Sequence, residues 1–156
     1  IQDLPGDIPI SRPVKGVMLH LQMNAKDPLI THLIKRPDGI ICPRSDGRLL
    51  IGVTHDDGET SLKASETDVA KLITSAARAI PAVRDLPLIE AAVGIRSLVG
   101  DGTLRLGRSA ELDGLFYSLS HAGTGFMRAP AVSKELADFL IDPNASCAHI
   151  DAFLTR

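Results

Sequence analysis

The stretch from Leu115 to Ile141, LFYSLSHAGTGFMRAPAVSKELADFLI, decides how this chain folds. It opens with an apolar run that predicts a β-strand, at Leu115, Phe116, Tyr117 and Leu119. Gly123 and Gly125 then predict a tight turn. Apolar residues at helical spacing follow the turn and predict a helix, at Val132, Leu136, Phe139 and Leu140. A strand, a turn and a helix start in this order direct free backbone N–H groups at one point, which favours an anionic or strongly polar ligand.

The composition of the 156 residues allows one well-filled core, or one domain with part of a second. Apolar residues make up 44% of the chain, which excludes disorder over most of its length. The net charge of −2, with Lys and Arg scattered, gives no electrostatic footprint for nucleic acid. Apolar runs are too short to cross a membrane, and the chain does not open with a signal-peptide pattern. We therefore expect a soluble cytoplasmic protein that binds neither nucleic acid nor membranes.

The first third of the chain predicts three or four antiparallel strands. Residues 16–23 alternate in polarity, with every second residue from Val17 onward on one face. Further strands are expected at 29–36, 39–44 and 48–54. The Asp46-Gly47 pair, between the last two of these segments, is a strong hairpin signal.

The middle of the chain predicts a capped helix that follows a polar loop at 55–61. Ser65 is suited to cap this helix, and Asp68 lies in its first turn. The apolar periodicity continues to Ile80, and Pro81 ends it. Beyond it we expect a strand at 86–93, a turn and short strand at 100–107, and an irregular tail from 142.

Three features are candidates for a site, and each also has a plainer explanation. A glycine pair such as Gly123 and Gly125 is most often turn chemistry alone. Arg96 follows a run of small residues at the end of an apolar strand, where a guanidinium is solvated on the surface, paired with another side chain, or bound to a ligand carboxylate with two hydrogen bonds. His121 precedes the glycine turn and is the one histidine that we take as a site candidate.

The other reactive side chains give no metal or nucleophile signature. The histidines show no metal-ligand spacing, and neither a Cys-x-x-Cys pair nor a G-x-S-x-G elbow occurs in the chain. His20 and His32 are expected to be structural residues of strands. Cys42 is expected to pack as a small hydrophobe, and it and Cys147 are expected to be free thiols in a reducing compartment. The residues alone therefore indicate an α+β domain whose helix start attracts anions.

The order of these segments resembles the C-terminal portion of FAD-dependent oxidoreductases of the D-amino acid oxidase, glycine oxidase and sarcosine oxidase family, from Pro13 to Arg156. The segment CPRSDGRLLIG, from Cys42 to Gly52, is similar to the P-R-x-D-G-R-hydrophobic-G hairpin of that family. The other landmarks follow in the order of the family: Lys15-Gly16, Ala79-Ile80-Pro81, Gly94-Ile95-Arg96, Asp101-Gly102, Leu106-Gly107 and Ser120 to Pro130. Each landmark is degenerate alone, but the set in this order and spacing is specific.

The resemblance implies an α+β fold with a mixed, largely antiparallel sheet and packed helices. We expect a lead-in segment at 1–13, a substrate-binding domain part at 14–98, a strand–turn–helix at 99–141 that completes an FAD domain, and an irregular tail at 142–156. The lead-in is polar, dotted with proline and without an initiator methionine, so we expect a fragment of a longer polypeptide. A homo-oligomer is compatible with this reading.

The resemblance also implies an activity and its residues. The reaction would be hydride transfer from the amine-bearing carbon of a small amino acid or amine to the flavin, giving an imine that water hydrolyses. Arg96 would bind the substrate carboxylate, and no dedicated catalytic base is required. The residues expected along the flavin are His121, Ala122, Gly123, Thr124, Gly125, Phe126 and Met127.

Several positions depart from the pattern of the family. Ile40 stands where several members place a substrate-binding Tyr, and Gly123 stands where glycine oxidases place an Arg, so we expect a more apolar pocket. Ser97 replaces the usual Pro, and Ser120 replaces a frequent Gly.

The G-x-G-x-x-G motif that holds the FAD pyrophosphate is missing from these 156 residues. We therefore expect weak or no FAD binding by this chain alone, and a partner half in cis or in trans. The alternative is a non-catalytic binding or interaction domain that derives from such an enzyme.

Overall fold

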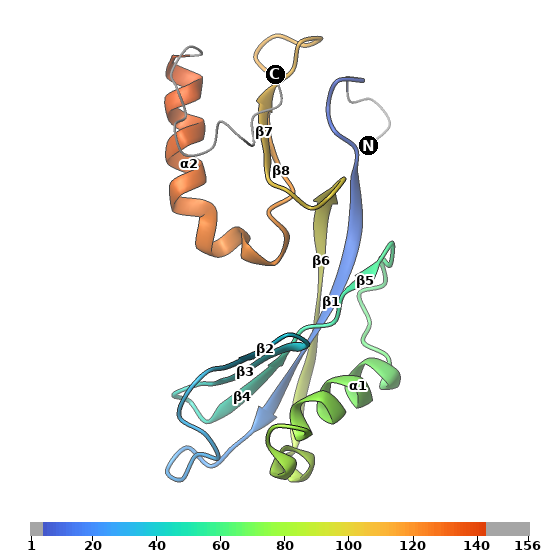
Figure 1. The fold of residues 1–156 in the computed structure, drawn as a ribbon, viewed down its shortest axis with the longest axis vertical. Coiled ribbons are helices and arrows are strands. Elements are labelled where there is room, and N and C mark those ends of the chain that lie inside the picture. Colours follow the sequence, from blue (N-terminus) through green and yellow to red (C-terminus); the bar gives the residue numbers. More distant parts are fainter. Residues whose placement is uncertain (1–4, 143–156) are drawn as a thin grey trace. The chain divides into compact units, whose positions relative to one another are not determined.

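The computed structural model describes residues 5–142, which belong to two compact units. The first, here called the sheet unit, runs from Val14 to Ile95. The second, here called the hairpin unit, comprises residues 5–13 and 96–142 of the described part of the chain. Two long strands, β1 (Ser11–Gln22) and β6 (Leu88–Val99), contribute residues to both units (Figure 1). The α+β class and the largely antiparallel sheets that the sequence predicts are confirmed.

The sheet unit is built on strands in the order β2-β3-β4-β1-β5, and β6 pairs with β1 as well. The shorter strands are β2 (Ile34–Arg36), β3 (Gly39–Pro43), β4 (Arg48–Gly52) and β5 (Asp56–Asp57). The hairpin predicted from Asp46-Gly47 joins β3 to β4, with Arg44 N–H donating to the Arg48 carbonyl at 2.8 Å. Gly47 has a φ of +87°, a conformation that glycine adopts without the steric cost of a Cβ.

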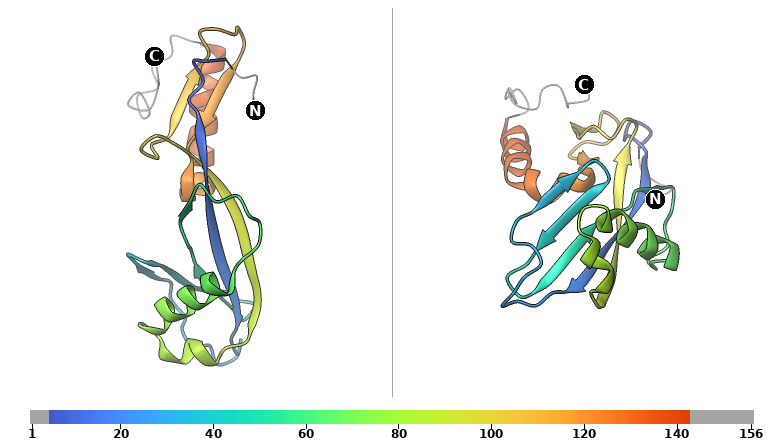
Figure 2. Two further views of the ribbon diagram at one scale, coloured as in Figure 1. Left: turned by 90° about the vertical axis from the view of Figure 1, so that its right-hand side faces the viewer. Right: turned by 60° about the horizontal axis from the view of Figure 1, so that its bottom comes forward.

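The core of the sheet unit lies between one face of the sheet and the helix α1 (Glu66–Ala77), as the two views of Figure 2 show. Val17, Leu19 and Leu21 of β1 are fully buried, and the residues between them are not, so the predicted alternation is confirmed. Leu72 and Ala76 of α1 belong to the same buried cluster. Burial of this apolar stripe is the main source of stability for a short helix such as α1.

The cap of α1 is the one that the sequence predicts. Ser65 Oγ accepts from Asp68 N–H at 3.1 Å, and an Asp68 carboxylate oxygen accepts from Ser65 N–H at 2.9 Å. Lys15 Nζ lies 3.3 Å from the same carboxylate, and both side chains are less than one-tenth exposed. The hydrogen bond from Ser65 N–H is the main cause that lowers the pKa of Asp68. The helix ends at Ala77, and Pro81 opens a short 3₁₀ turn, η1 (Pro81–Asp85).

Several predicted boundaries in the sheet unit are wrong. Of the strand expected at 29–36, only residues 34–36 form a strand, β2. His32 lies outside any strand. Leu29 and Leu33 are exposed, while Ile30 and Ile34 pack partly buried against the core, so this apolar run lacks a continuous buried face to hold it in a sheet. The polar loop expected at 55–61 contains β5, because Val14 and Lys15 of β1 pair with its two aspartates. β1 starts at Ser11, earlier than residue 16, and β6, which pairs with β1, runs past 93 to Val99.

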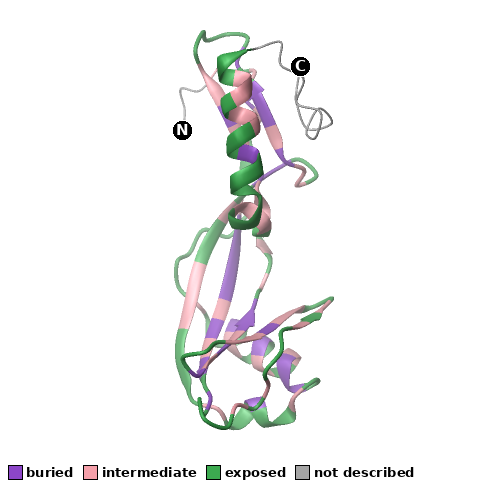
Figure 3. Cartoon of the chain, turned by 90° about the vertical axis from the view of Figure 1, so that its left-hand side faces the viewer, coloured by how far each residue is buried: buried purple, intermediate pink, exposed green. Residues whose placement is uncertain are grey.

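The hairpin unit consists of β7 (Arg105–Arg108), β8 (Phe116–Leu119) and α2 (Gly125–Ile141). Its buried cluster is small, with Leu104, Leu106 and Val132, against which Phe139 packs. Phe116 and Phe139 meet edge to face, with ring centroids 5.8 Å apart. A two-stranded sheet with one helix buries little apolar area, and Figure 3 shows α2 largely exposed.

The last helix of the hairpin unit contains a proline. Pro130 lies inside α2 and cannot donate a backbone hydrogen bond, which accounts for the bend near the start of this helix (Figure 1).

Among residues 5–142, no helix is long and apolar enough to cross a membrane. The expected irregular tail, with Cys147, lies from residue 143 onward outside the described residues.

Candidate functional site

The connection between β8 and α2 forms a sharp turn that differs from the one expected. Gly123 and Gly125 do not take left-handed conformations; Ser120, with φ +64°, and Ala122, with φ +50°, do. A side chain in the left-handed region costs about 1–2 kcal/mol. A short 3₁₀ turn, η2 (Ala122–Thr124), leads from this point into α2. The backbone strain therefore flanks His121 on both sides, at the residues expected to face a cofactor.

The contacts of Ser120 explain how a residue other than glycine is held in a left-handed backbone conformation in this turn. Its side chain is 1% exposed, and its Oγ accepts from the buried Val99 N–H at 3.2 Å. This bond joins the turn to the end of β6 and satisfies a backbone donor that would otherwise be buried without a partner. No local pattern signals this role, because it depends on a contact between residues far apart in the chain.

Replacing Ser120 by alanine is expected to lower the free energy of unfolding by about 1–3 kcal/mol, since Val99 N–H loses its acceptor while the left-handed strain remains. Ser120→Gly loses the same bond but removes the strain, so its loss should be smaller by about 1 kcal/mol. Urea denaturation of the two variants measures this difference. Ser120→Gly at least as destabilising as Ser120→Ala would contradict the assignment of strain to this residue.

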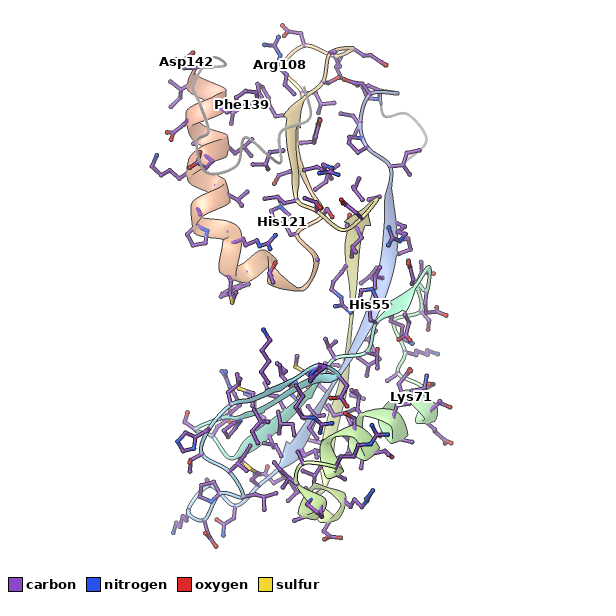
Figure 4. All side chains as sticks on the ribbon, viewed as in Figure 1. His55, Lys71, Arg108, His121, Phe139 and Asp142 are labelled. Atoms are coloured by element: carbon purple, nitrogen blue, oxygen red, sulfur yellow. The ribbon has the colours of Figure 1, made fainter. Side chains whose placement is uncertain are left out.

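His121 lies at the centre of the turn (Figure 4). Its Nε2 is 2.8 Å from Ser118 Oγ, and its backbone carbonyl accepts from both the N–H and the hydroxyl of Thr124. Its Nδ1 is buried and has no hydrogen-bond partner among the described residues. Such an atom is uncommon in a folded protein, and at a turn of this kind it marks a place where a further group is expected.

Arg96 lies in β6 and comes close to the same turn. A Cβ added to Gly123 would be 3.6 Å from Arg96 Nη1, so the guanidinium lies beside the Gly123 backbone. The structure thus brings together two of the residues selected from the sequence that are 27 positions apart. Arg96 is partly exposed, and its guanidinium is a planar group of several donors.

The start of α2 has backbone N–H groups that can donate hydrogen bonds to a ligand. Thr124, which precedes the helix, makes no side-chain capping hydrogen bond, and the first turn contains no acidic residue. The first backbone N–H groups of a helix have no partner within the helix, and they carry the positive end of its dipole. Phe126 and Met127, in this first turn, are 98% and 79% exposed. The site therefore combines a guanidinium, a helix start and an uncovered apolar pair.

Ile40 belongs to the sheet unit, whose placement relative to the hairpin unit is not described. It lies on β3, partly buried, opposite Gly52 on β4 and Lys35 on β2. Within residues 5–142, no group of three or more His, Cys, Asp or Glu side chains is arranged to hold a metal ion.

Comparison with protein families places these features in context. A family model described as "DAO: FAD dependent oxidoreductase" matches residues 1–139. Glycine oxidase of Bacillus licheniformis is 27% identical over 141 residues, which are 90% of this chain and 38% of that protein. Glycine oxidase of Geobacillus kaustophilus is 31% identical over 129 residues, which are 82% of this chain and 34% of that protein. The chain thus spans less than two-fifths of the length of either relative.

Solved structures give the same result. The crystal structure of glycine oxidase from Geobacillus kaustophilus matches 96% of this chain and 40% of its own, with a TM-score of 0.83 and 28% identity. L-proline dehydrogenase from P. horikoshii matches 95% of this chain and 40% of its own, also with a TM-score of 0.83. Because the latter is only 18% identical, it shows the fold alone.

Proposed function

The chain belongs to the FAD-dependent oxidoreductase family, and from that premise we propose that it is the substrate-side portion of an enzyme that oxidises the C–N bond of a small amino acid or amine. The longer relatives named above are glycine oxidases. The substrate is proposed as a class because Ile40 and Gly123 stand where the family often has Tyr and Arg.

The observation that carries this proposal is the guanidinium of Arg96 beside the turn at the start of α2. A guanidinium can bind a carboxylate with two parallel hydrogen bonds, which fixes both the position and the orientation of an amino acid. Orienting the substrate in this way converts binding energy into a correct approach to the reacting group. Arg96 is therefore assigned to the substrate carboxylate.

The residues of the turn fit one edge of a flavin. The uncapped helix start offers N–H donors, Gly123 and Gly125 allow close approach, and His121 Nδ1 is a buried polar atom without a partner. Residues 121–127 would hold the ring, and FAD, when bound, would supply the acceptor for the hydride. The chain has no pyrophosphate-binding motif, so the remainder of the cofactor is assigned to a partner half.

The exposed apolar side chains of α2 support a partner half that covers the hairpin unit. Leu140 and Ile141 are 50% and 84% exposed, in addition to Phe126 and Met127. The relatives are more than twice as long as this chain, which leaves ample polypeptide to cover such a surface. We propose that the partner half is joined in cis or binds in trans, and that the complete enzyme is cytoplasmic.

The experiment that tests the function uses the gene product that contains this chain, compared with residues 1–156 alone. The complete protein is expected to purify with FAD and to lose its visible flavin absorbance when a small amino acid is added without oxygen, whereas the chain alone should purify colourless. A complete protein without flavin, or with flavin that no amino acid or amine reduces, would contradict the proposal and favour a non-catalytic interaction domain.

A further inference from the structure

Ser118 and His121 form a side-chain pair within the turn that precedes α2. Ser118 Oγ and His121 Nε2 are 2.8 Å apart, a normal length for a hydrogen bond that either group can donate. The residues are three positions apart, and the left-handed Ser120 between them turns the backbone so that the two side chains meet. No role follows for Ser118 from the proposed function.

Ser118 faces the side of β8 that looks toward α2. Side chains alternate along a strand, so Ser118 shares a face with Phe116, whose ring contacts Phe139 of α2. Tyr117, on the opposite face, is buried, and its hydroxyl lies beside Gly107 of β7. Ser118 is only partly buried, and its hydroxyl contacts His121, which precedes the 3₁₀ turn that leads into α2.

The buried Nδ1 of His121 decides the direction of the hydrogen bond. If Ser118 donated to Nε2, the neutral imidazole would carry its proton on Nδ1, as a buried N–H without an acceptor among the described residues. If Nε2–H donates to Ser118 Oγ, Nδ1 carries no proton. The group that is then buried without a partner is the Nδ1 lone pair. Buried N–H groups without a partner are the rarer of the two in folded proteins, so the second arrangement is favoured.

We propose that Ser118 is a positioning residue that holds His121 as the Nε2–H tautomer and thereby keeps its own hydroxyl proton free to donate. The pair then offers one directed O–H donor beside His121, in the turn that leads into α2. The tautomer is a property of this chain alone. The use of the hydroxyl by a bound carbonyl or carboxylate rests on the proposed function.

Nitrogen-detected NMR of the histidine rings, on the ¹⁵N-labelled 156-residue chain at a pH where imidazole is neutral, tests the tautomer without a cofactor. The wild type should show the Nε2–H pattern for His121. Ser118→Ala should change the tautomer ratio about fivefold, the effect of one net hydrogen bond, and Ser118→Thr, which keeps a hydroxyl, should restore it. The signals of His20 and His55, which lie outside the hairpin unit, serve as internal controls and should not move.

An Nδ1–H pattern in the wild type, or an unchanged ratio in Ser118→Ala, would overturn the proposal. If Ser118→Ala does not fold, the wild-type and Ser118→Thr spectra decide the tautomer by themselves. In the complete enzyme, Ser118→Ala should shift the flavin absorbance spectrum and Ser118→Thr should not. The correct tautomer together with an unmoved flavin spectrum would leave the pairing intact and overturn the assigned use of the hydroxyl. The absence of flavin in the wild type would instead count against the proposed function alone.

Discussion

Replacing Arg96 by alanine in the complete enzyme is expected to lower kcat/KM for amino acid substrates by about 30- to 1,000-fold, which corresponds to about 2–4 kcal/mol for the loss of a bidentate carboxylate contact. The loss should appear mainly in KM if the contact is equally strong before and during the reaction. Amines without a carboxylate should be affected far less, because they never use the guanidinium. Steady-state kinetics with matched pairs of such substrates measures this difference.

Two further variants sharpen the test of Arg96. Arg96→Lys keeps the charge but not the planar pair of donors, so it should recover only part of the lost kcat/KM. Arg105→Ala is the matched control, because Arg105 lies in the same unit and contacts Asp101 at 3.4 Å, in a pair whose side chains are 24% and 65% exposed. An unchanged kcat/KM in Arg96→Ala, or an equal loss in Arg105→Ala, would remove Arg96 from the substrate site.

The second large effect concerns folding. Replacing Asp68 by alanine is expected to lower the free energy of unfolding by about 3–5 kcal/mol, since the buried Lys15 ammonium loses the carboxylate that it contacts. The same change removes the hydrogen bond from Ser65 N–H that caps α1. Lys15→Met should cost less, because the Asp68 carboxylate keeps its hydrogen bond from Ser65 N–H. Equal losses in the two variants would contradict this account of the pair.

The pH dependence follows from the lowered pKa of Asp68. The carboxyl has an ordinary pKa near 3.8, and the hydrogen bond from Ser65 N–H is the first cause that lowers it in the folded chain. The ionised Asp68 carboxylate therefore contributes fully to the free energy of unfolding at pH values above its ordinary pKa. This contribution is lost as the pH falls through the lower pKa that the group has in the folded chain. The stability difference between the wild type and Asp68→Asn should narrow below about pH 4. Lys134→Ala, in an exposed pair with Asp138, is the control and should change stability little.

The elements whose cause is local were predictable from the sequence. Ser65 and Asp68 form the expected cap, Asp46-Gly47 forms the expected hairpin, and β1 alternates as its pattern requires. In each of these, the residues that determine the structure are neighbours in the chain, so their spacing carries the information. The order of such landmarks also identified the family, which the family model confirms over residues 1–139.

Strand ends and the geometry of the turn depend on partners that are distant in sequence. The aspartates of β5 and the full lengths of β1 and β6 arise from pairing across the sheet, which no local pattern records. The run from Leu29 to Leu33 has the composition of a strand, but both of these leucines are exposed. Strand propensity is expressed only where a neighbouring strand and a covered face are present.

The turn between β8 and α2, at the candidate site, also has features with local causes and features that depend on distant residues. The sequence by itself determined that a strand, a turn and a helix follow one another from Leu115 to Ile141, and that Arg96 and His121 were candidates. Only the tertiary structure decided that the strained residues are Ser120 and Ala122, and that Arg96 lies beside Gly123. The physical reason is that the bond from Val99 to Ser120 and the approach of β6 to the turn join segments more than 20 residues apart, and those contacts hold a backbone conformation that the local sequence does not favour.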